Sequence, residues 1–203
     1  MSKGIYDTLV LAAGTSTRMG EWKLILPLRG KTIIERSVFN ALRVSKRVIL
    51  VGGYRVKELE KLFRDCDRVK VVFNRGYKRG MFSSIRCGVQ YVETERFFIT
   101  LGDMPLISSS TFIKIARYDF ADYIDVIRPQ YMGRKGHPVL LSHKLCGRIL
   151  AMDDNSTMSD ILKDYLNLYV PVNDPFVVRD IDSREDYRSL VEELENFSDR
   201  VDV

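Results

Sequence analysis

Hydrophobic positions along the chain fall into short runs of two kinds. Runs rich in β-branched and other apolar residues predict buried strands at 8–12, 48–51, 69–73, 97–101, 124–127, 138–141 and 168–172. Between the first four runs lie segments whose apolar residues recur at helical spacing, at 32–42, 56–63 and 84–91. Short apolar strands that alternate with helices pack as a parallel sheet covered on both faces, so the pattern predicts a three-layer αβα sandwich, Rossmann-like in type.

Two parts of the chain depart from this alternation. The runs at 124–127 and 138–141 are joined by QYMGRKGH with no helix between them, which predicts a hairpin and a mixed sheet there. A last helix is predicted over 183–194, where Ser183 and Asp186 have the spacing of an acidic capping box. The tail from about 196 to 203 is polar enough to fray. No repeat or linker interrupts residues 1–203, so we expect a single domain.

Composition excludes several classes of protein. An apolar content of 45% argues against a disordered chain, and no apolar run approaches the ~18 residues that a membrane span needs. The N-terminal MSKGIYDTLVLAAG lacks the layout of a signal peptide. The three cysteines form no CxxC pair and no even disulfide set, which is typical of reduced thiols in the cytoplasm. No apolar stripe is left over, so we expect a monomer.

The net charge of +5 favours anionic ligands. The basic residues are spread over several predicted loops rather than massed in one tract, and no helix-turn-helix or zinc-ligand pattern is present. Small phosphates are therefore favoured over nucleic acid.

The loop after the first predicted strand is small and basic. Small residues let backbone N–H groups approach a phosphate, and Arg18 and Lys23 would add full positive charge. Only Gly14 and Gly20 stand in this loop, which excludes the G-x-G-x-x-G fingerprint, and no glycine opens a P-loop before Gly30. The residues expected to cradle a nucleotide are Leu11, Ala12, Ala13, Gly14 and Thr15.

Three further loops carry candidate chemistry at predicted strand ends. After 69–73, glycines precede a helix start that offers donors and acceptors for a base or ribose, although serines there also serve as helix caps: Gly80, Met81, Ser83 and Ser84. Asp103 follows 97–101 in a turn formed by Gly and Pro, where a carboxylate can hold Mg²⁺ or simply stabilise the turn. Asp180 or Asp182 can complete a metal site or interact with the dipole of the last helix.

The hairpin segment Gly136, His137 and Pro138 is the remaining feature. We interpret His137 as a shape or hydrogen-bonding residue rather than a catalytic base. The serine, cysteine and histidine residues form no convincing nucleophilic triad, so hydrolysis through a covalent intermediate is not expected.

Five segments, taken in order, resemble the MobA-like nucleotidyltransferases: LAAGTSTRMGEWKLILPLRGKTIIE, GMFSSI, LGDMPLIS, GHPVLLS and DIDSREDY. The resemblance runs from about Thr8 to Tyr187 and is greatest to the molybdenum cofactor cytidylyltransferase (MocA-like) branch. It implies a GT-A-like nucleotidyltransferase domain that moves a nucleoside monophosphate from an NTP to a phosphorylated acceptor and releases pyrophosphate. The implied acceptor is molybdopterin, and the implied partners include transient contacts with molybdoenzyme maturation proteins.

The resemblance also assigns roles to individual residues. It implies that Arg18 and Lys23 hold the nucleotide phosphates and that Asp103 binds Mg²⁺ with a second carboxylate, Asp182 rather than Asp180. The Leu11–Gly14 backbone would bind the nucleotide, the loop from Gly80 to Ser84 would lie against base and ribose, and the Gly136–Pro138 segment would contact the acceptor. Ala13 resembles the cytidylyl branch, because guanylyl transferases usually carry Gly there, so CTP is the implied donor.

Some residues depart from the family pattern. MDDNSTM at 152–158 replaces a GD-x-G-A-R segment, Arg75 and Arg184 stand in place of prolines, and Phe82 replaces a small residue. Three alternatives therefore stay open: a guanylyltransferase or a sugar- or polyol-phosphate nucleotidyltransferase, a non-catalytic NTP-binding paralogue, and a glycosyltransferase. A glycosyltransferase usually carries D-x-D after a strand, where this chain has G-D-M-P.

Overall fold

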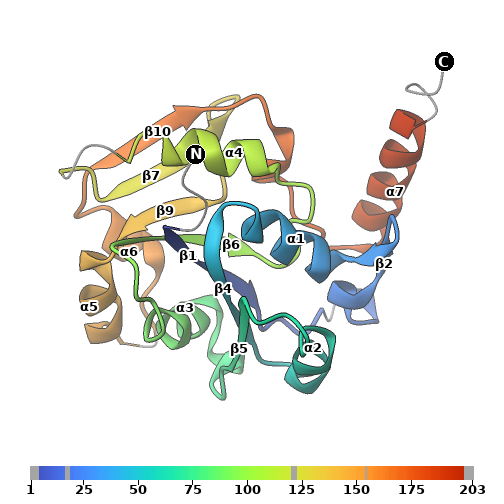
Figure 1. Ribbon diagram of the computed structural model, residues 1–203, viewed down its shortest axis with the longest axis horizontal. Coiled ribbons are helices and arrows are strands. Elements are labelled where there is room, and N and C mark those ends of the chain that lie inside the picture. Colours follow the sequence, from blue (N-terminus) through green and yellow to red (C-terminus); the bar gives the residue numbers. More distant parts are fainter. Residues whose placement is uncertain (1–4, 17–18, 120–122, 154, 199–203) are drawn as a thin grey trace.

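A mainly parallel sheet forms the middle layer of the protein (Figure 1). The computed structural model describes residues 5–16, 19–119, 123–153 and 155–198. Its large sheet has the strand order β10-β7-β9-β6-β1-β4-β5, with β8 paired to β7. The strands are β1 (Tyr6–Ala12), β4 (Ser45–Gly52), β5 (Val69–Phe73), β6 (Arg96–Leu101), β7 (Val126–Tyr131), β8 (Arg134–Lys135), β9 (Val139–Ser142) and β10 (Asn167–Pro171).

The strand directions confirm the prediction of a mixed sheet. β1 pairs in parallel with β4 and β6, and the outer pairs β4–β5 and β7–β10 are parallel too. β9 runs antiparallel between β6 and β7. Consequently β7 runs in the same direction as β6, and the carboxyl ends of β1, β4, β5, β6, β7 and β10 meet at one edge of the sheet.

The hairpin itself differs from the sequence-based expectation in its bounds. A strand was expected at 124–127, but β7 begins at Val126 and continues to Tyr131. The segment expected to be a connection supplies the end of β7 and all of β8, because Tyr131 pairs with Arg134 across a two-residue turn. Met132 and Gly133 form that turn with positive φ angles of 46° and 80°.

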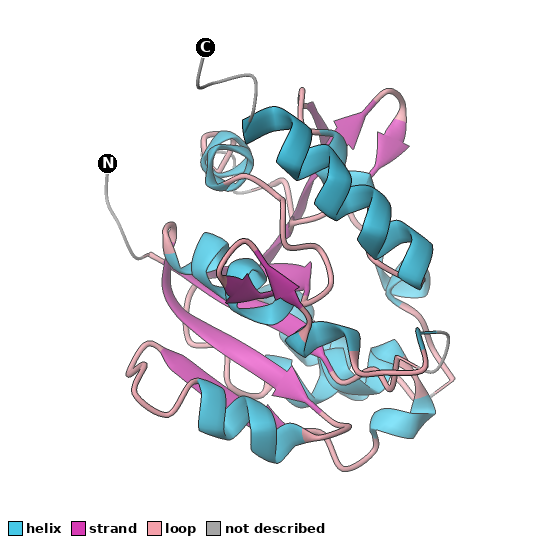
Figure 2. Cartoon of the chain, turned by 90° about the vertical axis from the view of Figure 1, so that its right-hand side faces the viewer, coloured by secondary structure: helices cyan, strands magenta, loops and turns pink. Residues whose placement is uncertain are grey.

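Helices cover both faces of the sheet (Figures 1 and 2). Phe97 and Phe98 are adjacent and fully buried, yet they belong to different core clusters because successive strand residues point to opposite faces. One face carries α1 (Ile33–Leu42), α2 (Val56–Leu62), α4 (Ser109–Ala116) and α7 (Arg184–Ser198), and the other carries α3 (Met81–Val89), α5 (Lys144–Ala151) and α6 (Met158–Leu162).

No described helix is long and apolar enough to cross a membrane.

The four predicted helices are present, and three short ones were missed. α4, α5 and α6 span five to eight residues. Their length alone does not explain why they were missed, since α2 has seven residues and was predicted. A cap signal was nevertheless present, since Thr157 and Asp160 form a capping box at α6. The remaining described elements are the β2 (Pro27–Leu28) and β3 (Lys31–Thr32) hairpin and the 3₁₀ turns η2 (Lys23–Ile25), η3 (Tyr77–Arg79) and η4 (Pro175–Val178).

The last helix extends further than expected. The Ser183–Asp186 cap forms as predicted: the Asp186 N–H donates to Ser183 Oγ over 3.1 Å, and the Ser183 N–H donates to Asp186 Oδ2 over 2.7 Å. α7 then continues to Ser198, so residues 196–198 are helical rather than frayed. The rest of the expected frayed tail, 199–203, lies outside the described residues.

Close packing of α3 on the sheet positions the loop that precedes this helix. A Cβ on Gly88 would lie 2.7 Å from Leu9 Cδ2 and 2.8 Å from Val51 Cγ2. Leu9 and Val51 are both fully buried, so neither side chain has room to move aside. Gly88 therefore sets the distance between α3 and strands β1 and β4.

We expect Gly88→Ala to lower the free energy of unfolding by about 1–3 kcal/mol because of overpacking, despite a helix-propensity gain of about 1 kcal/mol. Gly147→Ala in α5 is the matched control. Gly147 is exposed and has open space around it, so this variant should gain up to about 1 kcal/mol. Urea unfolding of both variants measures the difference. Equal stabilisation by the two substitutions would contradict the role given to Gly88.

Candidate active site

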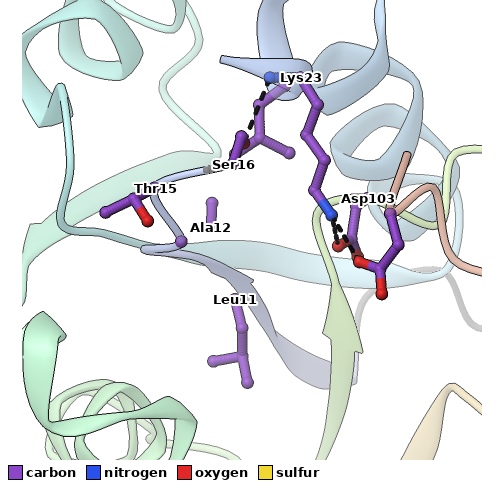
Figure 3. Close-up of a pocket in the computed structure, with 9 residues that line it drawn as sticks. Leu11, Ala12, Thr15, Ser16, Lys23 and Asp103 are labelled. Atoms are coloured by element: carbon purple, nitrogen blue, oxygen red, sulfur yellow. Dashed lines mark hydrogen bonds and ion pairs between the residues drawn. The ribbon is translucent and has the colours of Figure 1, made fainter. Parts of the chain in front are cut away.

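A small pocket lies against the loop that leaves β1 (Figure 3). Its volume is about 230 Å³. Ser16 turns this loop with a positive φ of 55°, and its Oγ accepts a hydrogen bond from the Lys23 N–H over 3.2 Å. That bond holds the start of η2 beside the loop. The lining residues are Leu11, Ala12, Gly14, Thr15, Ser16, Lys23, Leu24, Asp103 and Asp182.

The Lys23 ammonium is the centre of the pocket. Its Nζ lies 2.7 Å from Asp103 Oδ2 and 3.1 Å from Asp182 Oδ1, and it donates to the Ile181 carbonyl over 2.5 Å. Burial acts to lower the pKa of Lys23, but the two carboxylates outweigh it and the pKa is raised. Lys23 is therefore a partly buried cation whose three donor positions are all occupied.

Three carboxylates converge beside this ammonium. Oxygen atoms of Asp103, Asp180 and Asp182 lie within 4.8 Å of one another. Opposite ligands of an octahedral Mg²⁺ are about 4 Å apart, and Mg²⁺ prefers oxygen, so both spacing and donor type fit a hard divalent cation. Burial raises the pKa of the Asp103 carboxyl, the Lys23 ammonium lowers it, and the Asp180 carboxylate raises it. The net effect is a raised pKa. An added cation would relieve this crowding of negative charge.

The backbone ties the two acidic segments together. The Ile181 N–H donates to the Asp103 carbonyl over 3.2 Å, and the Asp182 N–H donates to Asp186 Oδ2 over 3.1 Å. Asp182 is partly buried against Lys23, whereas Asp180 is exposed. The structure thus brings both sequence candidates for the second carboxylate to Asp103 and does not choose between them.

A second pocket adjoins the first on the α3 side. It has a volume of about 220 Å³ and shares Leu11, Gly14 and Asp103 with the first pocket. Tyr77 lines it but was not singled out from the sequence, although it stands within the glycine-rich loop that was. The lining residues are Leu11, Ala13, Gly14, Tyr77, Gly80, Met81, Ser84, Leu101 and Asp103.

The two serines at the start of α3 have different surroundings. Asn74 Nδ2 donates to Ser83 Oγ over 2.9 Å and to Ser84 Oγ over 3.0 Å. Ser83 Oγ also lies 2.8 Å from the Gly80 carbonyl, and Ser83 is not among the lining residues, whereas Ser84 is. Gly80 has a positive φ of 101°, which glycine adopts without strain. The contact of Ser83 with a nucleotide stays a prediction, and its visible role is to hold the loop.

The Gly136–Pro138 segment lies near the acidic segment but lines neither pocket. The His137 N–H donates to the Val177 carbonyl over 2.8 Å, and a Cβ on Gly136 would lie 2.2 Å from that same oxygen. His137 Nδ1 lies 3.3 Å from the Ile99 carbonyl, so this nitrogen carries the proton of the neutral ring. Burial, chiefly, lowers the pKa of His137 to about 4. His137 is a neutral hydrogen-bonding residue near pH 7.

Arg18 lies outside the described residues, so its predicted contact with phosphate stays a prediction. Of the other residues predicted for the nucleotide, Leu11 to Thr15, Gly80, Met81 and Ser84 all line one or both of the adjoining pockets.

The sheet is mainly parallel and covered by helices on both faces, and an acidic cluster and two adjoining pockets lie at its carboxyl edge. This arrangement defines an α/β protein of the nucleotide-binding class. Residues 8–168 match the MobA-like NTP transferase domain, and the chain belongs to that family of nucleotidyltransferases. The chain is 34% identical over 183 residues to the molybdenum cofactor cytidylyltransferase of Escherichia coli (strain K12), covering 89% of this chain and 93% of the relative. It is 27% identical over 205 residues to a probable molybdenum cofactor guanylyltransferase of Bacillus anthracis, covering 97% and 100%.

Solved structures share the fold at lower identity. A nucleotidyl transferase from Methanothermobacter superposes with a TM-score of 0.81 at 24% identity, covering 95% of this chain and 99% of that one. The 4-diphosphocytidyl-2C-methyl-D-erythritol synthase of Anaerococcus prevotii gives a TM-score of 0.74 at 13% identity, covering 95% and 99%. The predicted αβα nucleotidyltransferase fold is confirmed.

The neutral state of His137 makes stability depend on pH. Because its folded pKa of about 4 lies below the unfolded value of 6.5, the unfolded chain binds a proton first as the pH falls. Because of this residue, the free energy of unfolding falls by up to about 3 kcal/mol as the pH drops from 6.5 to 4. In His137→Asn, whose amide can still donate to Ile99, that part of the pH slope should vanish. Urea unfolding from pH 7 to pH 4 measures it, and parallel slopes for the two proteins would refute it.

Proposed function

We propose that this protein transfers a cytidylyl group from CTP to molybdopterin and releases pyrophosphate. The observation that carries the proposal is the Lys23–Asp103–Asp182 cluster, which lines the first pocket and whose Asp103 also lines the second. The basic and acidic groups needed for phosphoryl chemistry therefore line the first pocket, and Asp103 connects this pocket with the one expected to take the base. The similarity to a relative named molybdenum cofactor cytidylyltransferase supports the choice of donor and acceptor.

Mg²⁺ would be held by Asp103 and Asp182, with Asp180 close enough to take part. When bound, a divalent cation neutralises charge on the phosphates of the nucleotide and of the leaving pyrophosphate. A Mycobacterium tuberculosis structure of the same fold is described as a complex with manganese, so Mn²⁺ belongs beside Mg²⁺ in any test.

The residues of the chain would act by positioning and by charge. Backbone N–H groups of the loop at 11–15 would face the phosphates, and Lys23 would neutralise charge that builds on the α-phosphate. An oxygen of the acceptor phosphate bonds to the α-phosphorus while the bond to the β-phosphate oxygen breaks, and the electron pair leaves with pyrophosphate. A phosphate monoester has a second pKa of ~6 and is mostly a dianion at neutral pH, so no general base is required. A neutral, hydrogen-bonded His137 is consistent with that chemistry.

Lys23 cannot serve the phosphates while all its donors are occupied. It must give up at least one of Asp103, Asp182 and the Ile181 carbonyl when the nucleotide enters. A cation that arrives with the nucleotide would take over the two carboxylates and free the ammonium. Metal and nucleotide are therefore expected to bind cooperatively. We further propose that residues 1–203 act as one nucleotidyltransferase domain.

Asp103→Ala and Lys23→Ala should each lower turnover ~10²-fold or more, as expected for loss of one electrostatic stabiliser of the transition state. Lys31→Ala is the matched control, because Lys31 is an exposed lysine whose ammonium stacks on Phe39 rather than facing the pocket. Pyrophosphate release with CTP, Mg²⁺ and molybdopterin measures the effect. Near-wild-type release by either site variant would remove that residue from the proposed mechanism.

Thermal unfolding with separate nucleotides tests the donor. We expect the largest upward shift of Tm with CTP, and only with Mg²⁺ or Mn²⁺; a ligand at ~100 times its Kd adds ~2.7 kcal/mol. Ala13 lines the second pocket, and Ala13→Gly removes one methyl, which is worth about tenfold in discrimination. The preference of Ala13→Gly for CTP over GTP should therefore be about tenfold weaker than that of wild type. A wild-type shift greatest with GTP would replace the proposed donor.

A guanylyltransferase is the second candidate, because several relatives carry that name, including the one from Bacillus anthracis. The altered segment at 152–158 leaves the acceptor less constrained than the donor. Turnover with a sugar or polyol phosphate but not with molybdopterin would reassign the acceptor. Nucleotide binding without pyrophosphate release from any acceptor would favour a non-catalytic paralogue.

A further inference from the structure

One arginine in the sheet interrupts a row of aliphatic side chains. In the strand register, Leu9 of β1 pairs with Ile99 of β6, and Ile99 pairs with Val139 of β9. Continuing the β7–β9 register by one residue sets Arg128 beside Val139, and Tyr169 of β10 pairs with Arg128 on its other side. Side chains paired in this way point to the same face of a sheet. A guanidinium thus occupies a position that β1, β6 and β9 fill with apolar residues.

Arg128 differs from the other sequestered arginines in having no counter-ion. Arg47 pairs with Asp7 over 2.9 Å, and Arg96 forms an ion pair with Asp119. Among the residues that the structure describes, Arg128 has neither an ion pair nor a hydrogen bond, and its Nε is buried without a partner. Burial lowers the pKa of this guanidinium, and the neighbouring Tyr169 opposes that shift only in part. Arginine nevertheless stays charged at neutral pH.

The surroundings of Arg128 are positive and aromatic. Lys135 Nζ lies 4.8 Å from the ring centroid of Tyr169, the residue that pairs with Arg128. The charge of Arg128 also acts on His137, whose backbone is bonded to η4 just before the acidic segment. Asp180 of the acidic segment also acts on His137, but neither Arg128 nor Lys135 forms an ion pair among the described residues. Two cations without an ion pair favour an anion at this place.

Its position in the sheet separates it from the nucleotide pockets. The pocket lined by Tyr77 and Met81 lies on the α3 and β5 side of Asp103. Arg128 lies on the opposite side, where β7 is two strand spacings, about 10 Å, from β6. Figure 1 shows β9 and β7 on the side of β6 away from β4 and β5, so Arg128 and the nucleotide pockets belong to different halves of the sheet.

We propose that Arg128, assisted by Lys135, binds the phosphate of the acceptor substrate and so determines acceptor specificity. The inference rests on the proposed nucleotidyl transfer and adds the residue that holds the second substrate. The planar guanidinium offers parallel N–H donors that match two phosphate oxygens, which a lysine cannot reproduce. An unpaired, half-buried cation costs stability in the empty protein, and an arriving dianion would compensate that cost.

Arg128→Met, Arg128→Lys and, as the matched control, Arg134→Met on the neighbouring exposed β8 test the proposal. Inorganic phosphate stands for the acceptor group and is added with CTP and Mg²⁺ already saturating. The Tm of wild type and of Arg134→Met should rise with phosphate, and that of Arg128→Met should not. The Tm shift caused by CTP and Mg²⁺ should be the same in all four proteins.

Kinetics supply a second readout. With molybdopterin as acceptor, Arg128→Met should raise the acceptor KM at least tenfold and leave the CTP KM unchanged, with partial recovery in Arg128→Lys. Without ligands, the Tm of Arg128→Met should equal or exceed that of wild type, because an apolar side chain replaces an unpaired charge.

Three results would overturn the proposal: a phosphate shift kept in Arg128→Met, an unchanged acceptor KM, or a Tm several degrees lower without ligand, which would make Arg128 a structural residue. Failure of the proposed function looks different, since wild type itself would then show neither a CTP shift nor pyrophosphate release.

Discussion

The ammonium of Lys23 connects three parts of the chain that are far apart in sequence. It joins the loop after β1 to Asp103 at the end of β6 and to the Ile181–Asp182 segment before α7. In the empty protein this partly buried cation keeps its partners, because a missing carboxylate would leave uncompensated charge away from water until a nucleotide and a metal ion enter. The position of each segment therefore depends on the other two. The pocket exists because this one electrostatic constraint closes the carboxyl edge of the sheet around β1 and β6.

The antiparallel strand β9 divides that edge into two halves. On the β5 side, α3 and its glycine-rich loop border the pocket shared by Leu11, Gly14 and Asp103. On the other side, the segment before β9 lies against η4 through the bond from His137 to Val177. Since β7 and β10 run parallel to β6, their carboxyl ends face the same edge. A reaction that joins two substrates can use both halves, with the acidic cluster between them.

Some partly buried charged side chains have an ion-pair partner, and others have none among the described residues. Arg47 and Arg96 have carboxylate partners, and Lys23 has two. Arg128 has none among the described residues, and His137 avoids charge altogether by staying neutral near pH 7. Compensated charges stabilise the loops in the empty protein. An uncompensated one is stabilising only when an anion arrives, and this is the usual conflict between stability and function in a binding site.

The sequence by itself determined the layers of the fold and the identity of most pocket residues. Hydrophobic periodicity is a local property, so it revealed the strands of the sheet except β8, and it revealed four of the helices. The rule that ligands bind at strand ends pointed to the loops at 11–15 and 80–84 and to Asp103. The cap at Ser183 was equally local. The sequence did not reveal α4, α5 and α6, which span five to eight residues.

Only the tertiary structure decided which distant groups meet. The contact of Lys23 with Asp103 and Asp182, the partner shared by Ser83 and Ser84, and the isolation of Arg128 all depend on strand order and register. None of these is encoded within a window of neighbouring residues. Electrostatic energy depends on distance and burial, and both are properties of the folded chain rather than of its sequence spacing.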